Sequence, residues 1–188
     1  MVFLTAAVIL LGALVAVDLL LTVGVIRRLR EHTERLDQLG HGFLPEPSFP
    51  PGSAIPDFET TDSDGDRVAT ADLAGAPYVL AFLSTGCSAC HEQLPAFAEL
   101  AGRVEGGRSR VVAIVEGAPD QVAAYVETLA PVARVVTGEH ALAVHTRFDM
   151  SVLPTYLVLD GDGTVRVNTS RAQDLDPASL GSLTASAG

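Results

Sequence analysis

The chain has 188 residues, of which 48% are hydrophobic, and its 23 acidic and 12 basic side chains give a net charge of −11. This acidic balance argues against nucleic-acid binding, which requires clustered Lys and Arg side chains on the phosphates. A chain of this length buries a core without disulfide staples, so its two cysteines are not needed as scaffolding. Proteins or small thiols are the partners that we expect instead.

The chain begins with one long apolar stretch. Residues 2–26 contain Asp18 as their only ionisable side chain, and at about 1.5 Å per residue a helix of this length crosses a hydrocarbon core of about 30 Å. A cleavable signal peptide has a charged first region and a shorter apolar run, whereas this run leads directly into a group of arginines that starts at Arg27. We therefore predict a single transmembrane anchor over residues 1–26, held in the lipid bilayer.

The composition changes after the anchor. Residues 27–55 start with mixed charges and with leucines at near-helical spacing, and continue into a segment rich in Pro and Gly, which predicts a stalk and a semi-extended linker. The globular domain is predicted over residues 56–170. Residues 171–188 carry weaker signals, with Asp176 and Pro177 as the start of one last short helix, and are predicted to form a weakly structured tail.

The predicted elements of the domain alternate between strands and helices. A hairpin comes first, and a continuous apolar run then predicts a strand buried on both faces, which leads into the two cysteines and a helix. The predicted strands are 58–61, 68–70, 78–83, 111–115, 132–136, 156–159 and 165–167, and the predicted helices are 91–103 and 120–129. This alternation predicts an α/β fold, with a β-hairpin extension at its N-terminal side.

Cys87 and Cys90 are separated by two residues at the predicted start of a helix. Only the first lies where the free N–H groups of the first helical turn point at it, and these groups stabilise a thiolate. The helix dipole contributes roughly 0.3 to 2 kcal/mol, and one pKa unit corresponds to about 1.4 kcal/mol. The position at the helix start can therefore supply most of the decrease in thiol pKa that a nucleophile needs. We predict Cys87 as the nucleophile and Cys90 as the thiol that resolves the mixed disulfide.

Two segments carry a resemblance to a known family. Residues 82–95, FLSTGCSACHEQLP, resemble the active-site segment of the TlpA-like thioredoxin family, in which a proline follows the second cysteine by five residues, as Pro95 does here. Residues 152–156, VLPTY, resemble the second family signature, a cis-proline that precedes a strand and faces the dithiol. The match covers residues 56–168. With the anchor and the Pro-rich linker, it looks especially like the membrane-bound branch that includes the methylamine-utilisation accessory protein.

The resemblance implies a thioredoxin fold, with a central mixed sheet flanked by helices, and a membrane-tethered thiol–disulfide oxidoreductase that needs no cofactor and no metal. Its partners would be protein thiols and disulfides, together with a redox partner that resets the dithiol. A cis Pro154 would aim the backbone of Leu153 at an extended substrate chain, whereas a trans proline opening an edge strand is the alternative. The residues that would support the dithiol are Gly86, His91, Glu92 and Pro95.

The chain departs from the family pattern at two positions. Most relatives carry Trp directly before the first cysteine, whereas this chain has Gly86 there and no Trp at all, which leaves the dithiol less covered. Thioredoxin itself has a buried Asp six residues before its first cysteine, which accepts the proton of the buried thiol, whereas this chain has Ala81. Proton transfer is therefore expected to use water, His91 or Glu92.

Two indications of membrane orientation oppose each other. No basic side chain precedes the apolar run and four follow it, which by the positive-inside rule places the domain in the cytoplasm. These arginines are Arg27, Arg28, Arg30 and Arg35. A tethered dithiol is more useful where disulfides persist. On the strength of the resemblance we expect the domain outside the cytoplasm, in a reductive or maturation role, although oxidants, reductants and isomerases share these residues and differ in redox potential.

Two other chemistries use the same residue types. The motif C-x-x-C-H, completed by His91, also attaches c-type haem, with Met150 as an available distal ligand, but the apolar strand before the motif and the later hairpin fit a haem protein poorly. A zinc site would need a second cluster of ligands, and His140 and His145 have no thiol near them in the sequence.

A peroxidase, a calcium-binding loop and a non-catalytic binding module are three further alternatives. A peroxidase of the peroxiredoxin type requires a Thr three residues before the cysteine and a Pro four before that, whereas Thr85 lies two before and Leu80 holds the other position. The acidic turn at residues 62–66 resembles a calcium loop only in part, because it lacks the final Glu. A thioredoxin-like binding module with an idle dithiol is the non-catalytic alternative.

Overall fold

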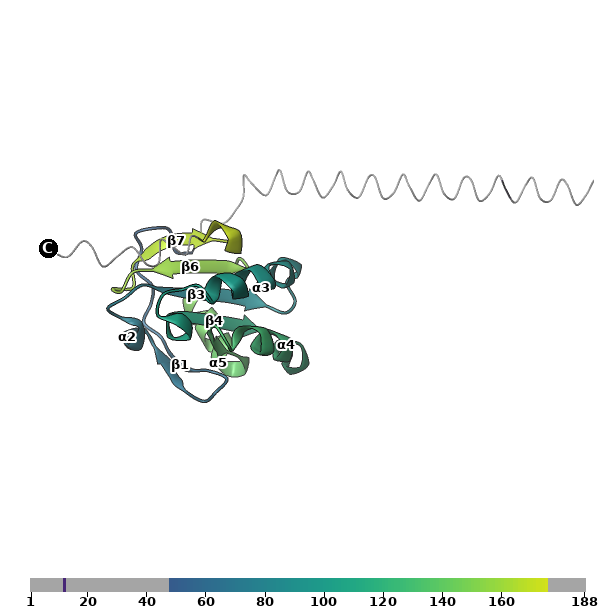
Figure 1. Ribbon diagram of the computed structural model, residues 1–188, viewed down its shortest axis with the longest axis horizontal. Helices are drawn as coiled ribbons and strands as arrows, with labels where there is room; N and C mark the ends of the chain where they lie inside the picture. The colour runs from purple at the N-terminus through teal and green to yellow at the C-terminus, as the bar shows by residue number, and fades with distance from the viewer. Residues whose placement is uncertain (1–11, 13–47, 176–188) are drawn as a thin grey trace, which may run out of the picture. The chain divides into compact units, whose positions relative to one another are not determined.

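A five-stranded sheet forms the centre of the computed structural model, which describes Gly12 and residues 48–175 (Figure 1). The strand order is β5-β4-β3-β6-β7, in which β3, β4 and β5 are parallel while β6 and β7 run antiparallel to their neighbours. The strands are β3 Tyr78–Ser84, β4 Val111–Glu116, β5 Arg134–Val136, β6 Thr155–Leu159 and β7 Val165–Thr169. The sheet is therefore mixed, and β3 lies at its middle.

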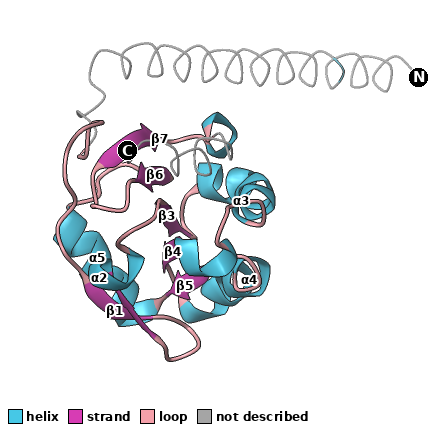
Figure 2. Ribbon diagram, turned by 60° about the vertical axis from the view of Figure 1, so that its left-hand side comes forward, coloured by secondary structure: helices cyan, strands magenta, loops and turns pink. Residues whose placement is uncertain are grey.

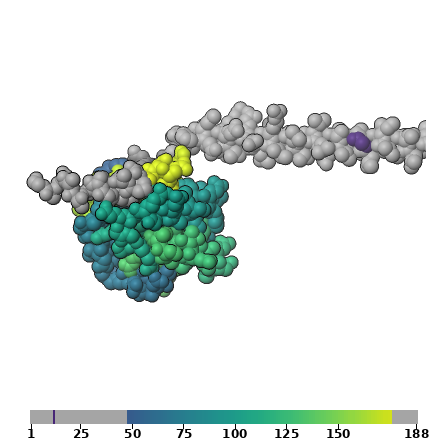
Figure 3. Space-filling model, viewed as in Figure 1, coloured from purple at the N-terminus to yellow at the C-terminus, as the bar shows by residue number. Residues whose placement is uncertain are grey.

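Helices cover both faces of this sheet (Figure 2). Helices α3 (Ser88–Ala101) and α4 (Pro119–Leu129) lie on one face, and their surface occupies much of the side toward the viewer in Figure 3. Helix α5 (Gly138–Phe148) covers the other face together with the short helix α2 (Thr70–Leu73) and the hairpin that contains β1. Each face has its own hydrophobic cluster, which we call the α3/α4 cluster and the α5 cluster.

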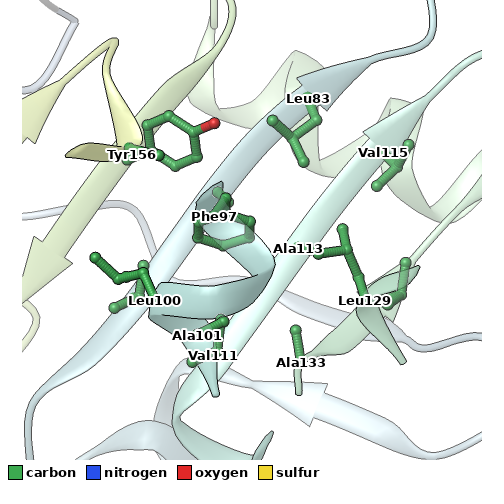
Figure 4. Packing of buried hydrophobic residues seen from close by; sticks show 14 of the residues in the cluster. Leu83, Phe97, Leu100, Ala101, Val111, Ala113, Val115, Leu129, Ala133 and Tyr156 are labelled. Atoms are coloured by element: carbon green, nitrogen blue, oxygen red, sulfur yellow. The ribbon is translucent and has the colours of Figure 1, made fainter. Parts of the chain in front are cut away.

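The alternation of side chains along β3 assigns its residues to the two clusters. Val79, Ala81 and Leu83 belong to the α3/α4 cluster, whereas Tyr78, Leu80 and Phe82 belong to the α5 cluster. A strand whose side chains are buried on both faces needs an apolar residue at every position, which explains the continuous apolar run in the sequence. Figure 4 shows the α3/α4 cluster, where side chains of α3 pack onto those of β3, β4 and β6.

The predicted hairpin is present as an antiparallel pair, β1 (Glu59–Thr61) and β2 (Arg67–Ala69). Its turn is held by Asp62, whose Oδ1 accepts hydrogen bonds from the backbone N–H groups of Asp64 and Asp66 at 3.1 and 2.9 Å. Local bonds of this kind are the reason why Asp is favoured in turns. The other carboxylate oxygen, Oδ2, accepts a bond of 2.9 Å from Nε of Arg134 in β5, which ties the hairpin to the central sheet.

The sequence predicted most of these elements, and the structure adds others. All seven predicted strands are present, with small shifts in their ends, and helix α3 begins at Ser88 rather than at residue 91 because Cys87 takes the N-cap position. Helix α5 was missed, although Ala141, Val144 and Phe148 follow one another at helical spacing and are buried. Two 3-10 helices, η1 (Gly107–Arg110) and η2 (Ala172–Asp174), were not predicted either.

The packed region extends beyond the predicted domain limits at residues 56 and 170. At its start, Gly52 donates a backbone hydrogen bond to Val165 at 2.7 Å, and the ring of Phe49 lies 5.4 Å from that of Phe148. At its end, Leu175 is 3% exposed and belongs to the α3/α4 cluster. The Pro/Gly-rich segment thus contributes to the edge of the fold, because its backbone bonds to β7.

Several predictions fall on other parts of the chain. The anchor over residues 1–26, apart from Gly12, the stalk up to residue 47 and the helix at Asp176 all lie outside the described residues. Within Gly12 and residues 48–175, no helix combines the length and the hydropathy that a membrane crossing requires.

Candidate functional site

Cys87 lies between the end of β3 and the start of α3. Its backbone N–H donates to the carbonyl of Ser84 at 3.2 Å, which closes the turn, and its Sγ accepts a hydrogen bond of 3.2 Å from the N–H of Cys90. Cys87 is therefore the N-cap residue of α3, with its sulfur in the position that a capping oxygen usually takes. Backbone N–H groups at a helix start stabilise negative charge, so the site suits a nucleophilic thiolate.

Cys90 lies one turn further along α3 and is fully buried. Both cysteines are free thiols. Burial, followed by the hydrogen bond and the charge of Cys87, raises the pKa of Cys90 to about 12. The two sulfurs therefore differ in character: one is half-buried at a helix start, whereas the other is a neutral thiol in the α3/α4 cluster.

The loop before β6 lies against the dithiol. The peptide bond between Leu153 and Pro154 is cis, as the family resemblance implies. The Cys87 thiol donates to the carbonyl oxygen of Leu153 across 3.5 Å, although the two residues are 66 positions apart in the sequence. Leu153 is half-buried and Pro154 is buried. The structure thus brings together Cys87, Cys90, Leu153 and Pro154 at one end of the central sheet.

The predicted supporting residues take different positions around this group. Nε2 of His91 lies 2.8 Å from the carbonyl oxygen of Thr85, so the ring braces the turn between β3 and α3 with a donated N–H. Gly86 is exposed in this turn, and its N–H donates to the Ser84 hydroxyl at 3.2 Å. Glu92 and Pro95 lie on the exposed side of α3, and Pro95 interrupts the helical hydrogen-bond ladder because it has no N–H.

Sequence reasoning missed the residues that hold the turn from outside. The N–H of Thr85 donates to the carbonyl of Glu116 at 2.9 Å, and its hydroxyl donates to Oε1 of Gln121 at 2.9 Å. Gly117 is required beside it, because a Cβ there would lie 2.0 Å from Oγ1 of Thr85. No local sequence pattern indicates these contacts, since the partners are more than 30 positions apart in the sequence.

Two buried tyrosines near the dithiol were missed as well. Tyr125 of α4 and Tyr156 of β6 belong to the same cluster as Cys90, and neither hydroxyl has a hydrogen-bond partner. Burial, followed by the charges of Cys90 and Cys87, raises the pKa of Tyr125 to about 12 and raises that of Tyr156 as well. Their rings are apolar and therefore read as core positions in the sequence.

Met150 and His145, which the haem and zinc alternatives would use, do not lie at the dithiol. Met150 packs against the α5 cluster, on the other face of the sheet from Cys90. His145 lies on that face too, with its ring 5.3 Å from that of Phe82. Asp62 of the acidic turn binds Arg134. Among Gly12 and residues 48–175, no three His, Cys, Asp or Glu residues are arranged to hold a metal ion.

The sheet, the helices and the dithiol together define a thioredoxin-like α/β protein. The chain belongs to the AhpC/TSA family, whose model matches residues 51–168. No curated protein matches the chain in sequence.

Solved structures share this fold. A thiol:disulfide interchange protein from Bacteroides sp. superposes with a TM-score of 0.57 at 16% identity, over 73% of this chain and 95% of that one. The thioredoxin domain of a thiol-disulfide oxidoreductase from Bacteroides vulgatus has a TM-score of 0.55 at 16% identity, over 68% and 93%. A thio-disulfide isomerase from Thermus thermophilus has a TM-score of 0.52 at 24% identity, over 65% and 87%. At these identities the similarity establishes the fold.

Proposed function

We propose that this chain is a thiol–disulfide oxidoreductase that exchanges the Cys87–Cys90 dithiol with the disulfides of protein substrates. The observation that carries the proposal is the asymmetry of the two sulfurs. Cys87 caps α3 and accepts an N–H at its Sγ, whereas Cys90 is buried directly behind it. The oxidoreductases and the isomerase with the same fold support this reading.

The reaction proceeds in two exchanges. The Cys87 thiolate attacks one sulfur of a substrate disulfide, which forms a mixed disulfide and releases the other substrate sulfur as a thiolate. Cys90 then loses its proton to water and attacks Cys87, so that the Cys87–Cys90 disulfide forms and the second substrate thiolate leaves. The substrate gains two electrons, and the dithiol loses them. An external reductant restores the dithiol.

The backbone of Leu153 provides the place where the substrate chain lies. Its carbonyl oxygen is 3.5 Å from the Cys87 sulfur, and an extended segment that pairs with this backbone would hold its own cysteine next to Cys87. The exposed Gly86 leaves the approach to the sulfur open, because no side chain projects from that position. A protein substrate therefore fits the site better than a small molecule that needs an enclosing pocket.

The test of the proposed function uses the full-length chain in detergent, with insulin as the protein disulfide and dithiothreitol as the reductant. We expect it to accelerate insulin reduction, and we expect Cys87→Ser to abolish the acceleration. Equilibration against glutathione mixtures gives the potential, and a value below about −220 mV indicates a reductant while one above about −180 mV indicates an oxidant. A Cys87 that reacts no faster than free glutathione would reject catalysis and leave the binding module.

The membrane anchor and the side of the membrane on which the domain lies can be tested separately. We propose that residues 2–26, which are apolar and long enough to cross a bilayer, anchor the chain. We also propose that the domain lies outside the cytoplasm in a reductive or maturation role, because its disulfide substrates persist there, against the arginine count. The test labels intact cells that express the chain with a membrane-impermeant maleimide after mild reduction. Labelling of Cys87 before lysis supports this orientation, whereas labelling only after lysis places the domain in the cytoplasm. Release of the chain by high salt, without detergent, argues against the anchor.

A further inference from the structure

Three tyrosines of this fold bury their hydroxyl groups without a hydrogen-bond partner. They are Tyr78, Tyr125 and Tyr156, each at most 1% exposed. A buried tyrosine usually finds a partner for its hydroxyl, because a buried polar group without one is unfavourable. Phenylalanine would fill the same space without that penalty. An unpaired buried hydroxyl is therefore free to donate a hydrogen bond when a new acceptor forms within its reach.

Two of the three hydroxyls lie on the same side of the sheet as Cys90. Tyr125 and Tyr156 belong to the α3/α4 cluster with Cys90, whereas Tyr78 belongs to the α5 cluster. The ring of Tyr125 lies 5.3 Å from that of His91, the residue next to Cys90 in α3. The two phenols therefore come from different elements, α4 and β6, and share one buried environment with the thiol.

Tyr156 lies in β6, directly after the loop that carries the cis-proline. It follows Pro154 by two residues and pairs in register with Ala81 of β3, whose small side chain leaves room for the ring. Its ring packs 5.0 Å from that of Phe97 in α3. Figure 4 shows the hydroxyl oxygen directed toward β3 near Leu83, which is the end of the strand that leads to the dithiol.

The electrostatics of the cluster couple these groups. Charge on Cys90 and on Cys87 raises the pKa of both phenols, in addition to the effect of burial, so the negative charge of a thiolate reaches both hydroxyls. Both phenols consequently stay protonated at neutral pH. A neutral phenol carries one O–H donor, which is the group that a thiolate needs.

Several other buried polar groups of the described chain already have partners. The Thr155 hydroxyl donates to the Val152 carbonyl, and a backbone hydrogen bond with Ser84 lowers the pKa of Cys90 without offsetting its burial. Asp62, the only carboxylate that is buried among residues 48–175, is bound to Arg134 beneath the hairpin. The Thr85 hydroxyl donates to Gln121, and His91 donates to the Thr85 carbonyl. Cys90 must nevertheless become a thiolate to attack the mixed disulfide, in a cluster whose other members are aliphatic or aromatic.

We propose that the hydroxyls of Tyr125 and Tyr156 donate hydrogen bonds to the Cys90 thiolate during the resolving step. This inference rests on the proposed function. The proton of Cys90 leaves to water, the electron pair of its sulfur forms the new bond to Cys87, and the bond between Cys87 and the substrate sulfur breaks with its pair on the substrate. Both phenols keep their protons throughout and rotate toward the sulfur as its charge develops.

The two steps are separated with the full-length, reduced chain in detergent and with an equimolar aromatic disulfide, 5,5′-dithiobis(2-nitrobenzoate), as the probe. Attack by Cys87 releases one coloured thiolate and resolution by Cys90 releases the second, so stopped-flow absorbance gives one phase for each step. In Tyr125→Phe and Tyr156→Phe we expect the second phase to slow roughly five- to tenfold each, since one hydrogen bond to a charged sulfur is lost. The first phase should not change.

A pH profile distinguishes stabilisation of the thiolate from a structural role. A tenfold loss corresponds to an increase of about one unit in the apparent pKa of the second phase, whereas a packing defect would alter the free energy of unfolding without moving that pKa. Tyr78→Phe is the matched control, because it removes an unpaired buried hydroxyl from the other cluster, and it should leave both phases unchanged.

The outcomes separate the two proposals. An unchanged second phase in the double variant Tyr125→Phe/Tyr156→Phe, with a normal first phase, overturns the role of the phenols and leaves the oxidoreductase intact. A first phase no faster than that of Cys87→Ser overturns the proposed function itself. Equal slowing in Tyr78→Phe also rejects the inference, because it would show a general effect of buried hydroxyls.

Discussion

Asp62 and Cys90 are two buried ionisable groups in different parts of the domain, and their surroundings are opposite. The Asp62 side chain is 0% exposed and Cys90 is fully buried, so burial alone disfavours the charged form of both. Burial raises the pKa of Asp62, but the hydrogen bond and charge of Arg134 and two backbone N–H groups outweigh it, and the pKa is lowered overall. Cys90 has no such cation, and its pKa rises to about 12.

The difference shows how one fold treats a structural charge and a reactive group. Asp62 has its donors in place in the resting state, so its charge is fixed and connects the hairpin to β5. Cys90 lies in an apolar cluster without such donors in place, and its burial keeps it neutral until the resolving step requires the thiolate. A fully satisfied buried group adds rigidity, whereas an unsatisfied one is available for a change of state.

The largest effect that the comparison predicts concerns Cys90. Cys90→Ala removes the resolving thiol, so turnover with insulin should be lost while the first attack by Cys87 continues. The mixed disulfide between Cys87 and an insulin chain should then accumulate. Mass spectrometry under non-reducing conditions detects the adduct, and Cys87→Ser should not form it. Continued turnover by Cys90→Ala would show that a second molecule resolves the intermediate.

The next largest effect concerns Asp62. Asp62→Asn leaves the Arg134 guanidinium, whose side chain is 17% exposed, without its carboxylate, and we expect a loss of about 3 to 5 kcal/mol in the free energy of unfolding. Urea titration followed by circular dichroism measures it. The control is Asp72→Asn, because Asp72 pairs with Arg67 at the surface and should contribute less than about 1 kcal/mol. Equal losses in the two variants would contradict the distinction.

The dithiol and the loop before β6 show what the sequence could predict. The roles of Cys87 and Cys90 are local, since they depend on a helix start next to a strand, and the sequence pattern was enough to predict them. Leu153 and Pro154 were reached only through a resemblance, because nothing in their own neighbourhood indicates that they lie against a cysteine 66 positions away. These site residues stay predictions until exchange is measured.

The contacts that no pattern revealed are those between distant polar side chains. The sequence placed Asp62 only in an acidic turn, whereas its side chain is buried against Arg134, 72 positions later. Tyr125 and Tyr156 read as ordinary core residues, because periodicity reports whether a side chain is buried but not whether its hydroxyl is satisfied. Helix α5 was within reach, since Ala141, Val144 and Phe148 have helical spacing, but its polar residues between them obscured the pattern.

A smaller effect is expected where backbone geometry, rather than a polar partner, positions the dithiol. Gly117 has φ +153, and a Cβ there would lie 2.0 Å from Oγ1 of Thr85. Gly117→Ala should therefore displace Thr85 and cost about 1 to 3 kcal/mol in the free energy of unfolding, as overpacking does. Gly86→Ala, in the turn that contains Thr85, serves as the control for stability, because its Cβ would meet no atom closer than 3.7 Å. Equal stability of the two variants would show that the loop relaxes freely.

The smallest effect is a dependence of stability on alkaline pH. Because folding raises the pKa of Cys90 from about 8.5 in an unfolded chain to about 12, the unfolded state ionises first as the pH rises. The contribution of Cys90 to the free energy of unfolding of the reduced protein is therefore fully present below about pH 8.5. Above that pH it declines by up to about 1.4 kcal/mol per pH unit. Urea titrations at about pH 7 and about pH 9.5 measure this loss below the range in which unfolded tyrosines ionise, near pH 10.

Asp62 gives the opposite sign in the same experiment. Its lowered pKa means that the stability it contributes is present above about pH 4 and is lost as the pH falls through the folded pKa. Cys90→Ala should remove the alkaline loss and keep the acid one, whereas Asp62→Asn should weaken the acid loss and keep the alkaline one. If both variants kept both the acid loss and the alkaline loss of stability, neither group would control the pH dependence.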